Sequence, residues 1–292
     1  QQKERITLAR KRQSEHADCR FLFMVMGCDA IAPKLFLCYD GRDKTPHWQA
    51  NWNMVIDFHT HAFAERIAGK AIQNLKRSSG NIEPAFDGTI GGLRRYLEEN
   101  AIDRAVVMNI ATNPAQQHNV NNFAIQENQG RLVCFGSVHP DAPDALEELH
   151  RIREAGLKGI KLHPDYQHFY VDEDRMLPIY ETAGKLGLIV CFHSGVDIGF
   201  YEPVHCTPER LSRVLDVFRA PVIAAHMGAY QQWYDVEDYL VGKKVLFDTA
   251  FCYGCMPRGH AQKIIAAHGA ENILFGSDMP WSGPKEELFF IH

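Results

Sequence analysis

Four histidines and one aspartate that could bind a metal ion are spread over the 292 residues. They are the pair His59 and His61, then His193, His226 and Asp278. Each follows a short apolar run. Imidazole nitrogens and a carboxylate oxygen suit Zn²⁺, which we expect here, and Mn²⁺ or Fe²⁺ accept the same set. Because one divalent ion lowers the pKa of a bound water toward about 7, the pattern indicates metal-assisted chemistry.

Short apolar runs bounded by turn residues predict the buried strands that must position these side chains. Eight such runs follow residue 53: Met54–His59, Arg104–Ile110, Leu132–Val138, Gly159–Leu162, Leu188–His193, Val222–His226, Val245–Thr249 and Ile273–Gly276. Seven segments with helical spacing lie between them: Ile90–Glu99, Asn119–Asn128, Pro143–Ala155, Asp172–Lys185, Pro208–Arg219, Val236–Val241 and Arg258–Gly269. Alternating strands and helices predict an α/β fold, a (β/α)8 TIM barrel.

The candidate residues fall at the carboxyl ends of the predicted strands, where the active sites of such barrels lie. Side chains two apart on a strand share a face, so Asp57, His59 and His61 face the barrel axis if Ile56 and Phe58 face the helices. Alternatives remain for the other candidates. His193 could be a satisfied core histidine, and Asp278 a helix cap or turn residue.

The sequence leaves the roles of His226, Lys161 and His163 open. His226 either completes a second metal site or acts as a general acid/base, and we favour the second role. Lys161 and His163 share a face of the fourth predicted strand, and both are candidates to bind a second metal ion or the substrate. A buried lysine needs a partner. Lys161 could pair with a barrel carboxylate, bind a substrate anion, or carry a carbamate that bridges two ions.

Composition excludes several classes of protein. The net charge of −5 and pI near 6.3 argue against a nucleic-acid partner, and no apolar stretch reaches the length of a membrane span. Eight irregularly placed cysteines do not form a disulfide framework, so we expect a reducing cytoplasm. Residues 1–53 differ in charge from the rest, and we expect an N-terminal extension outside the catalytic fold. The catalytic domain is then 54–292, with its final helix apparently truncated.

The motifs from Met54 onward resemble the amidohydrolase superfamily. Within it, the chain is similar to the amidohydrolase-related branch, which contains aminocarboxymuconate-semialdehyde decarboxylase and metal-dependent hydrolases. The resemblance implies one divalent metal, commonly Zn²⁺, held by His59, His61, His193 and Asp278. It implies His226 as the acid/base and, frequently, a homodimer.

Two reactions fit this site. We expect a hydrolase in which Asp278 or His226 takes a proton from a metal-bound water that attacks a small ester, lactone or amide. The alternative is a non-oxidative decarboxylase, which needs a cation for the substrate carboxylate, and Arg66 is the nearest candidate. A non-catalytic metal-binding barrel is a further alternative. Substrate specificity would come from the predicted loops 62–86, 165–171, 194–206 and 251–258.

Overall fold

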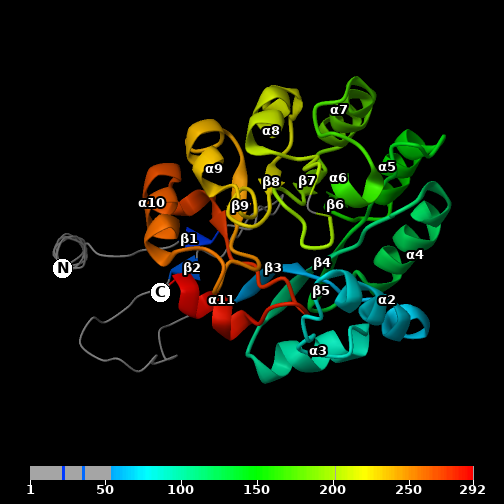
Figure 1. The fold of residues 1–292 in the computed structure, drawn as a ribbon. Coiled ribbons are helices and arrows are strands. Elements are labelled where there is room, and N and C mark those ends of the chain that lie inside the picture. Colours follow the sequence, from blue (N-terminus) through cyan, green and yellow to red (C-terminus); the bar gives the residue numbers. More distant parts are fainter. Residues whose placement is uncertain (1–21, 24–34, 37–53, 201, 292) are drawn as a thin grey trace, which may run out of the picture.

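The computed structural model describes residues 22–23, 35–36, 54–200 and 202–291. Short parallel strands form its centre, and helices surround them (Figure 1). The parallel strands are β3 (Ile56–Thr60), β4 (Arg104–Met108), β5 (Leu132–Phe135), β6 (Gly159–Leu162), β7 (Ile189–Phe192), β8 (Val222–Ala224), β9 (Leu246–Asp248) and β10 (Ile273–Leu274). All eight coincide with predicted apolar runs, and most end earlier than predicted.

The strands form two sheets whose edges meet at two seams. One sheet has the order β3-β4-β5 and the other β10-β9-β8-β7-β6. At the first seam, Gly136 beyond β5 bridges Ile160 of β6; at the second, Thr60 of β3 bridges Met279 beyond β10. Phe58 N–H also donates to the Phe275 carbonyl across the second seam, at 2.8 Å. The strand order is therefore that of a (β/α)8 barrel.

The helices pack outside the strands. They are α2 (Glu65–Ser78), α3 (Ile90–Glu99), α4 (Gln117–Glu127), α5 (Ala145–Glu154), α6 (Pro164–Gln167), α7 (Leu177–Lys185), α8 (Pro208–Val214), α9 (Trp233–Tyr239), α10 (Arg258–His268) and α11 (Pro284–Ile291). Short 3-10 turns flank several of them: η1 (Pro114–Gln116), η2 (Asp174–Met176), η3 (Leu215–Val217) and η4 (Ala270–Asn272). Thr207 caps α8 by accepting a hydrogen bond from Arg210 N–H. No helix in the described ranges has both the length and the apolar character needed to span a bilayer.

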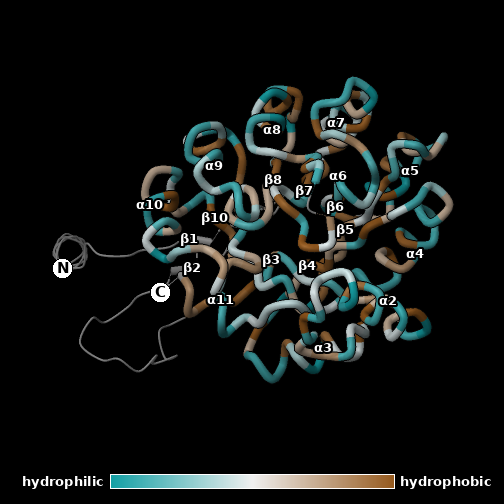
Figure 2. Tube along the Cα trace, in the orientation of Figure 1, coloured by the Kyte–Doolittle hydropathy of each residue, from teal (hydrophilic) through white to brown (hydrophobic). Residues whose placement is uncertain are grey.

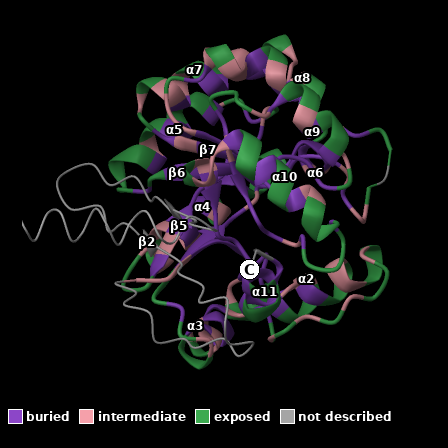
Figure 3. Cartoon of the chain, turned by 90° about the vertical axis from the view of Figure 1, so that its left-hand side faces the viewer, coloured by how far each residue is buried: buried purple, intermediate pink, exposed green. Residues whose placement is uncertain are grey.

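Two apolar layers hold the strands in place. A large cluster joins the outward strand residues to the helices, and a small cluster inside the barrel consists only of strand residues such as Phe135 and Cys191. Figure 2 shows the hydrophobic residues concentrated along the strands and inner helix faces, and Figure 3 shows the central strands buried. Phe58 belongs to the inner cluster and does not face the helices, so the condition under which Asp57, His59 and His61 would share the axial face is not met. The pairing of β3 shifts register between Asp57 and Thr60, which breaks strict alternation.

The predicted loop 62–86 contains a 14-residue helix, α2. Its signal was present in the apolar residues Ile67, Ala68, Ala71, Ile72 and Leu75, which recur at helical spacing. After β10, α11 runs from Pro284 to Ile291, where the truncated final helix was predicted. In the N-terminal part, a two-residue ladder pairs Leu22–Phe23 with Leu35–Phe36. The rest of the predicted extension 1–53 lies outside the described residues.

Candidate active site

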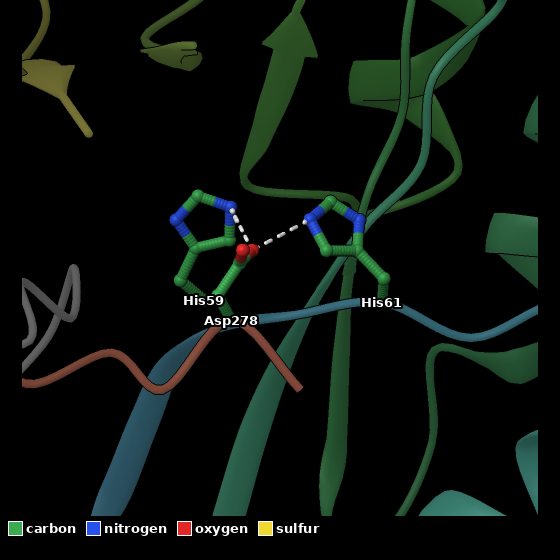
Figure 4. Close-up of side chains that lie close together, drawn as sticks. All are labelled: His59, His61 and Asp278. Carbon is green, nitrogen blue, oxygen red and sulfur yellow. Dashed lines mark ion pairs between the residues drawn. The ribbon is translucent and has the colours of Figure 1, made fainter. Parts of the chain in front are cut away.

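Three of the predicted ligands meet at the carboxyl ends of β3 and β10. Oδ1 of Asp278 lies 3.4 Å from Nε2 of His59 and 3.2 Å from Nε2 of His61. Figure 4 shows the carboxylate between the two imidazole rings. His59 is buried and Asp278 nearly so, with exposed fractions of 1% and 9%. Their backbones are also joined, since Asp278 N–H donates to the His59 carbonyl at 2.8 Å.

Hydrogen bonds on the far side of each ring determine which nitrogen faces the centre. Nδ1 of His59 lies 2.8 Å from Oδ2 of Asp248, and Nδ1 of His61 lies 3.0 Å from the Met108 carbonyl. The Met108 carbonyl can only accept a hydrogen bond, and the Asp248 carboxylate can only accept one when it is ionised. Each Nδ1 therefore carries the hydrogen, and each Nε2 presents a lone pair. Ligating histidines in metalloproteins are typically oriented in this way.

The Nε2 lone pairs of His59 and His61 therefore point toward the Asp278 carboxylate. Burial, followed by the charge of Lys161, holds the pKa of His59 well below its usual value, so its ring is neutral. Two imidazole lone pairs and a carboxylate repel one another unless a cation lies between them. These donors fit a divalent metal ion.

His193 and His226 form a second hydrogen-bonded pair beside this centre. Nδ1 of His226 lies 2.9 Å from the Ala250 carbonyl and therefore carries a hydrogen. Its Nε2 then accepts from Nδ1 of His193, at 3.1 Å. Nε2 of His193 is left with a lone pair, and this buried atom has no hydrogen-bond partner. A free buried lone pair is what a metal-ligating histidine presents.

The structure does not place His193 within the His59, His61 and Asp278 group. Its donor atoms instead cluster with His163 and Asp197. His163 is the N-cap of α6, and its Nδ1 accepts a hydrogen bond from Tyr166 N–H at 3.4 Å. Nε2 of His163 must then carry the hydrogen, and it lies 3.3 Å from the Asp197 carboxylate. In this arrangement His163 is a donor to Asp197, which disfavours it as a metal ligand.

Lys161 lines the cavity of the site, and in the part of the chain that the structure describes it has no acidic partner. Nζ is 3.3 Å from Nε2 of His59 and 3.7 Å from Sγ of Cys191. Among the described residues its side chain makes no ion pair with a carboxylate. The side chain is only 1% exposed. Of the three roles considered for this lysine, pairing with a barrel carboxylate is therefore not what the structure shows.

A cavity of about 620 Å³ connects these groups to the surface. His59, His61, Lys161, His193 and His226 all contribute to its wall, as does Asp278. The ring of His193 stacks on that of His163 at 4.1 Å, and His163 stacks on Tyr166 at 3.8 Å, measured between centroids. The site can therefore hold a small molecule against an aromatic wall.

The sequence analysis did not identify two carboxylates of this site. Asp248 ends β9, one strand-end away from the predicted ligands, and its Oδ1 also accepts from His226 N–H at 2.8 Å. The sequence feature that could have identified Asp248 is its position at the end of a predicted strand. Asp197 lies in the loop after β7 and had no comparable signal. His226 and Asp278 have left-handed backbones, with φ of 61° and 66°, a strain that is common at functional sites.

A family model described as amidohydrolase matches residues 56–292. None of the curated protein sequences is measurably similar to the chain. Among solved structures, 5-carboxyvanillate decarboxylase from Sphingomonas paucimobilis shares 17% identity, with 82% of this chain and 92% of that chain covered and a TM-score of 0.60.

Two further structures are similar to the chain. The 5-carboxyvanillate decarboxylase of Novosphingobium aromaticivorans, complexed with manganese and a nitrobenzoic acid, shares 15% identity over 80% of this chain and 89% of that chain, with a TM-score of 0.59. The 2,6-dihydroxybenzoate decarboxylase of Rhizobium shares 15% identity over 81% and 91%, with a TM-score of 0.56. At these identities the likeness establishes the fold, which is the predicted TIM barrel.

Proposed function

The chain belongs to the amidohydrolase family, and from this premise we propose that it is a metal-dependent decarboxylase of an aromatic or similarly unsaturated carboxylic acid. This choice reverses our expectation from the sequence, which favoured a hydrolase. The solved structures that resemble the chain include decarboxylases of two aromatic acids, and this supports the reversal.

The observation that carries the proposal is Lys161. The sequence offered Arg66 as the nearest cation for a substrate carboxylate, and binding of a substrate anion as one of three roles for Lys161. We propose that Lys161, which lines the cavity, has this role. Its present acceptor is the lone pair of His59 Nε2. Once that lone pair is used for a metal ion, Nζ needs another acceptor. A substrate carboxylate in the cavity would supply the anionic partner that Lys161 lacks among the described residues.

We propose that His59, His61 and Asp278 hold one divalent ion, with the free Nε2 of His193 as a fourth ligand. Zn²⁺ remains our expectation, and Mn²⁺ or Fe²⁺ suit the same donors. When bound, the ion supplies Lewis-acid polarisation of a substrate oxygen. Asp248 keeps the ring of His59 in its ligating tautomer, and the Met108 carbonyl does the same for His61.

The reaction breaks the bond between the substrate carbon and its carboxylate. Carbon dioxide leaves, the electron pair stays on the carbon, and a proton must be delivered there. We propose His226 as the proton donor. In this structure its Nε2 accepts from His193, so a proton on that nitrogen must displace this contact before it can be transferred.

Hydrolysis is the second candidate, and one observation favours it. The carboxylate of Asp278 lies between His59 and His61, where it could accept a proton from an attacking water. An ester, lactone or amide would then be the substrate, and no carboxylate recognition by Lys161 would be needed.

The two reactions are separated by their products. The metal-loaded protein is incubated with a panel of hydroxylated aromatic acids and, separately, with esters, lactones and amides. We expect carbon dioxide from at least one acid, and none from the Lys161→Met variant at equal metal content. Cleavage of an ester, lactone or amide with no carbon dioxide from any acid would replace the proposal with the hydrolase.

A further inference from the structure

The cavity reaches far beyond the metal centre. We propose that its outer part binds an elongated apolar arm of the substrate. This inference rests on the proposed function. It identifies the substrate as a carboxylic acid with an extended hydrocarbon substituent or a second ring. The reacting carboxylate lies at the inner end, beside Lys161.

One long wall of the cavity is a stripe along α2. Ile67, Ala71, Asn74, Leu75 and Ser78 all line it, and they recur at the spacing of a single helix face. From Ile67 to Ser78 the stripe is about 16 Å long at 1.5 Å per residue. A one-ring acid held at the metal centre would cover only its inner part.

The opposite wall comes from α4 and from the loop after β7. Asn119, Val120 and Phe123 face the cavity from α4, and Ile198 and Gly199 from the loop. A Cβ built on Gly199 would lie 3.3 Å from Cβ of Ser78, so the loop meets the carboxyl end of α2 there. The cavity is therefore an elongated groove between two helices, with this loop along one side.

Some apolar residues of this groove also have a packing role, since Phe123 and Ile198 pack against the large hydrophobic cluster. Ala68 and Ile72 are the buried residues of α2, and they lie on a neighbouring face. Ile67 is 46% exposed. Within the described residues, Ile67, Leu75 and Val120 belong to neither hydrophobic cluster. Apolar surface left in a recess that continues an active site is typical of ligand contact.

Charge in the lining indicates which end takes which part of the substrate. Asp278 is at the inner end near His59, as is Lys161. Asp197 connects the two parts, since one oxygen lies 3.3 Å from Nε2 of His163 and the other accepts from Gly199 N–H at 2.7 Å. Arg66 is exposed on the first turn of α2. The stripe beyond Arg66 presents apolar and uncharged polar side chains. It suits a neutral hydrocarbon arm.

Measuring how tightly substituted acids bind tests the groove assignment independently of turnover. Hydroxybenzoates carrying linear alkyl chains of one to six carbons, meta or para to the carboxylate, are titrated calorimetrically into the metal-loaded protein. In at least one series we expect about three- to fourfold tighter binding for each added methylene. Ala71→Trp and, from the opposite wall, Val120→Trp should abolish this dependence. Gln73→Trp, on the exposed side of the same helix, should retain it.

The outcomes separate the two proposals. If alkyl chains tighten binding but no acid releases carbon dioxide, the groove is assigned correctly and the decarboxylase is not. If one-ring acids are decarboxylated while chain length leaves binding unchanged or weakens it, the groove assignment is overturned and the decarboxylase stands. Unchanged binding would also result if another segment of the chain or a second copy filled the groove. Comparable circular dichroism and metal content of the three variants exclude misfolding as the cause.

Discussion

Nδ1 of His59 and Oδ2 of Asp248 are 2.8 Å apart, although they lie 189 residues apart in the sequence. The first residue is at the end of β3 and the second at the end of β9. This hydrogen bond decides which nitrogen of His59 faces Asp278. The other carboxylate oxygen of Asp248 accepts from His226 N–H, so one side chain orients two of the candidate functional residues.

Replacement of Asp248 by Asn should weaken metal binding about 10- to 100-fold. The amide oxygen can still accept from His226 N–H, but the amide nitrogen then faces His59 and forces the hydrogen onto Nε2. Competition with a chromophoric chelator measures the affinity. An unchanged affinity would show that the tautomer of His59 does not matter for the site.

His193→Ala should reduce metal affinity more than tenfold, which corresponds to more than about 1.4 kcal/mol. The reason is the free lone pair on its buried Nε2. His118→Ala is the matched control, because His118 is exposed and lies outside the cavity. Equal metal content in the two variants after dialysis against chelator would exclude His193 as a ligand.

Lys161→Met should keep the metal and lose affinity for carboxylate ligands. A hydrogen bond to a charged group contributes about 1.5–3 kcal/mol, so we expect binding of an aromatic acid to weaken by roughly 10- to 150-fold. The corresponding methyl ester should bind both proteins equally. If the acid also binds both equally, Lys161 has no role in recognising the carboxylate.

Glu287 predicts a pH dependence of stability. Burial raises the pKa of this carboxyl from 4.5 to about 8, while it accepts hydrogen bonds from Cys252 N–H and Tyr253 N–H. Between these two pH values the folded protein holds a proton that the unfolded chain has released. Stability should therefore fall as the pH rises from 5 to 8, by up to about 1.4 kcal/mol per pH unit.

Glu287→Gln removes this titration while retaining a neutral side chain of the same size. Urea unfolding at pH 5, 6.5 and 8 should show a smaller decline in the free energy of unfolding than in the natural protein. Parallel declines in the two proteins would mean that Glu287 is ionised in the folded state.

Much of the fold could be predicted because its signals are local. Apolar runs separated by helical periodicity were sufficient to place eight strands, and α3 was predicted with its observed bounds, Ile90–Glu99. The missed helix α2 also had a local signal, but its residues had been assigned to a substrate loop. The direction of Phe58 could not be predicted, because it depends on a register shift set by pairing with β4.

The sequence by itself determined the chemical types at the strand ends: the His59 and His61 pair, His193, His226 and Asp278, together with the barrel that gathers strand ends at one face. Only the tertiary structure decided how these side chains divide. It placed Asp278 between His59 and His61, joined His193 to His226, and gave Lys161 no acidic partner among the described residues. The physical reason is that ring orientation and proton position depend on hydrogen-bond partners such as Asp248 and Ala250, which lie on other strands and are distant in sequence.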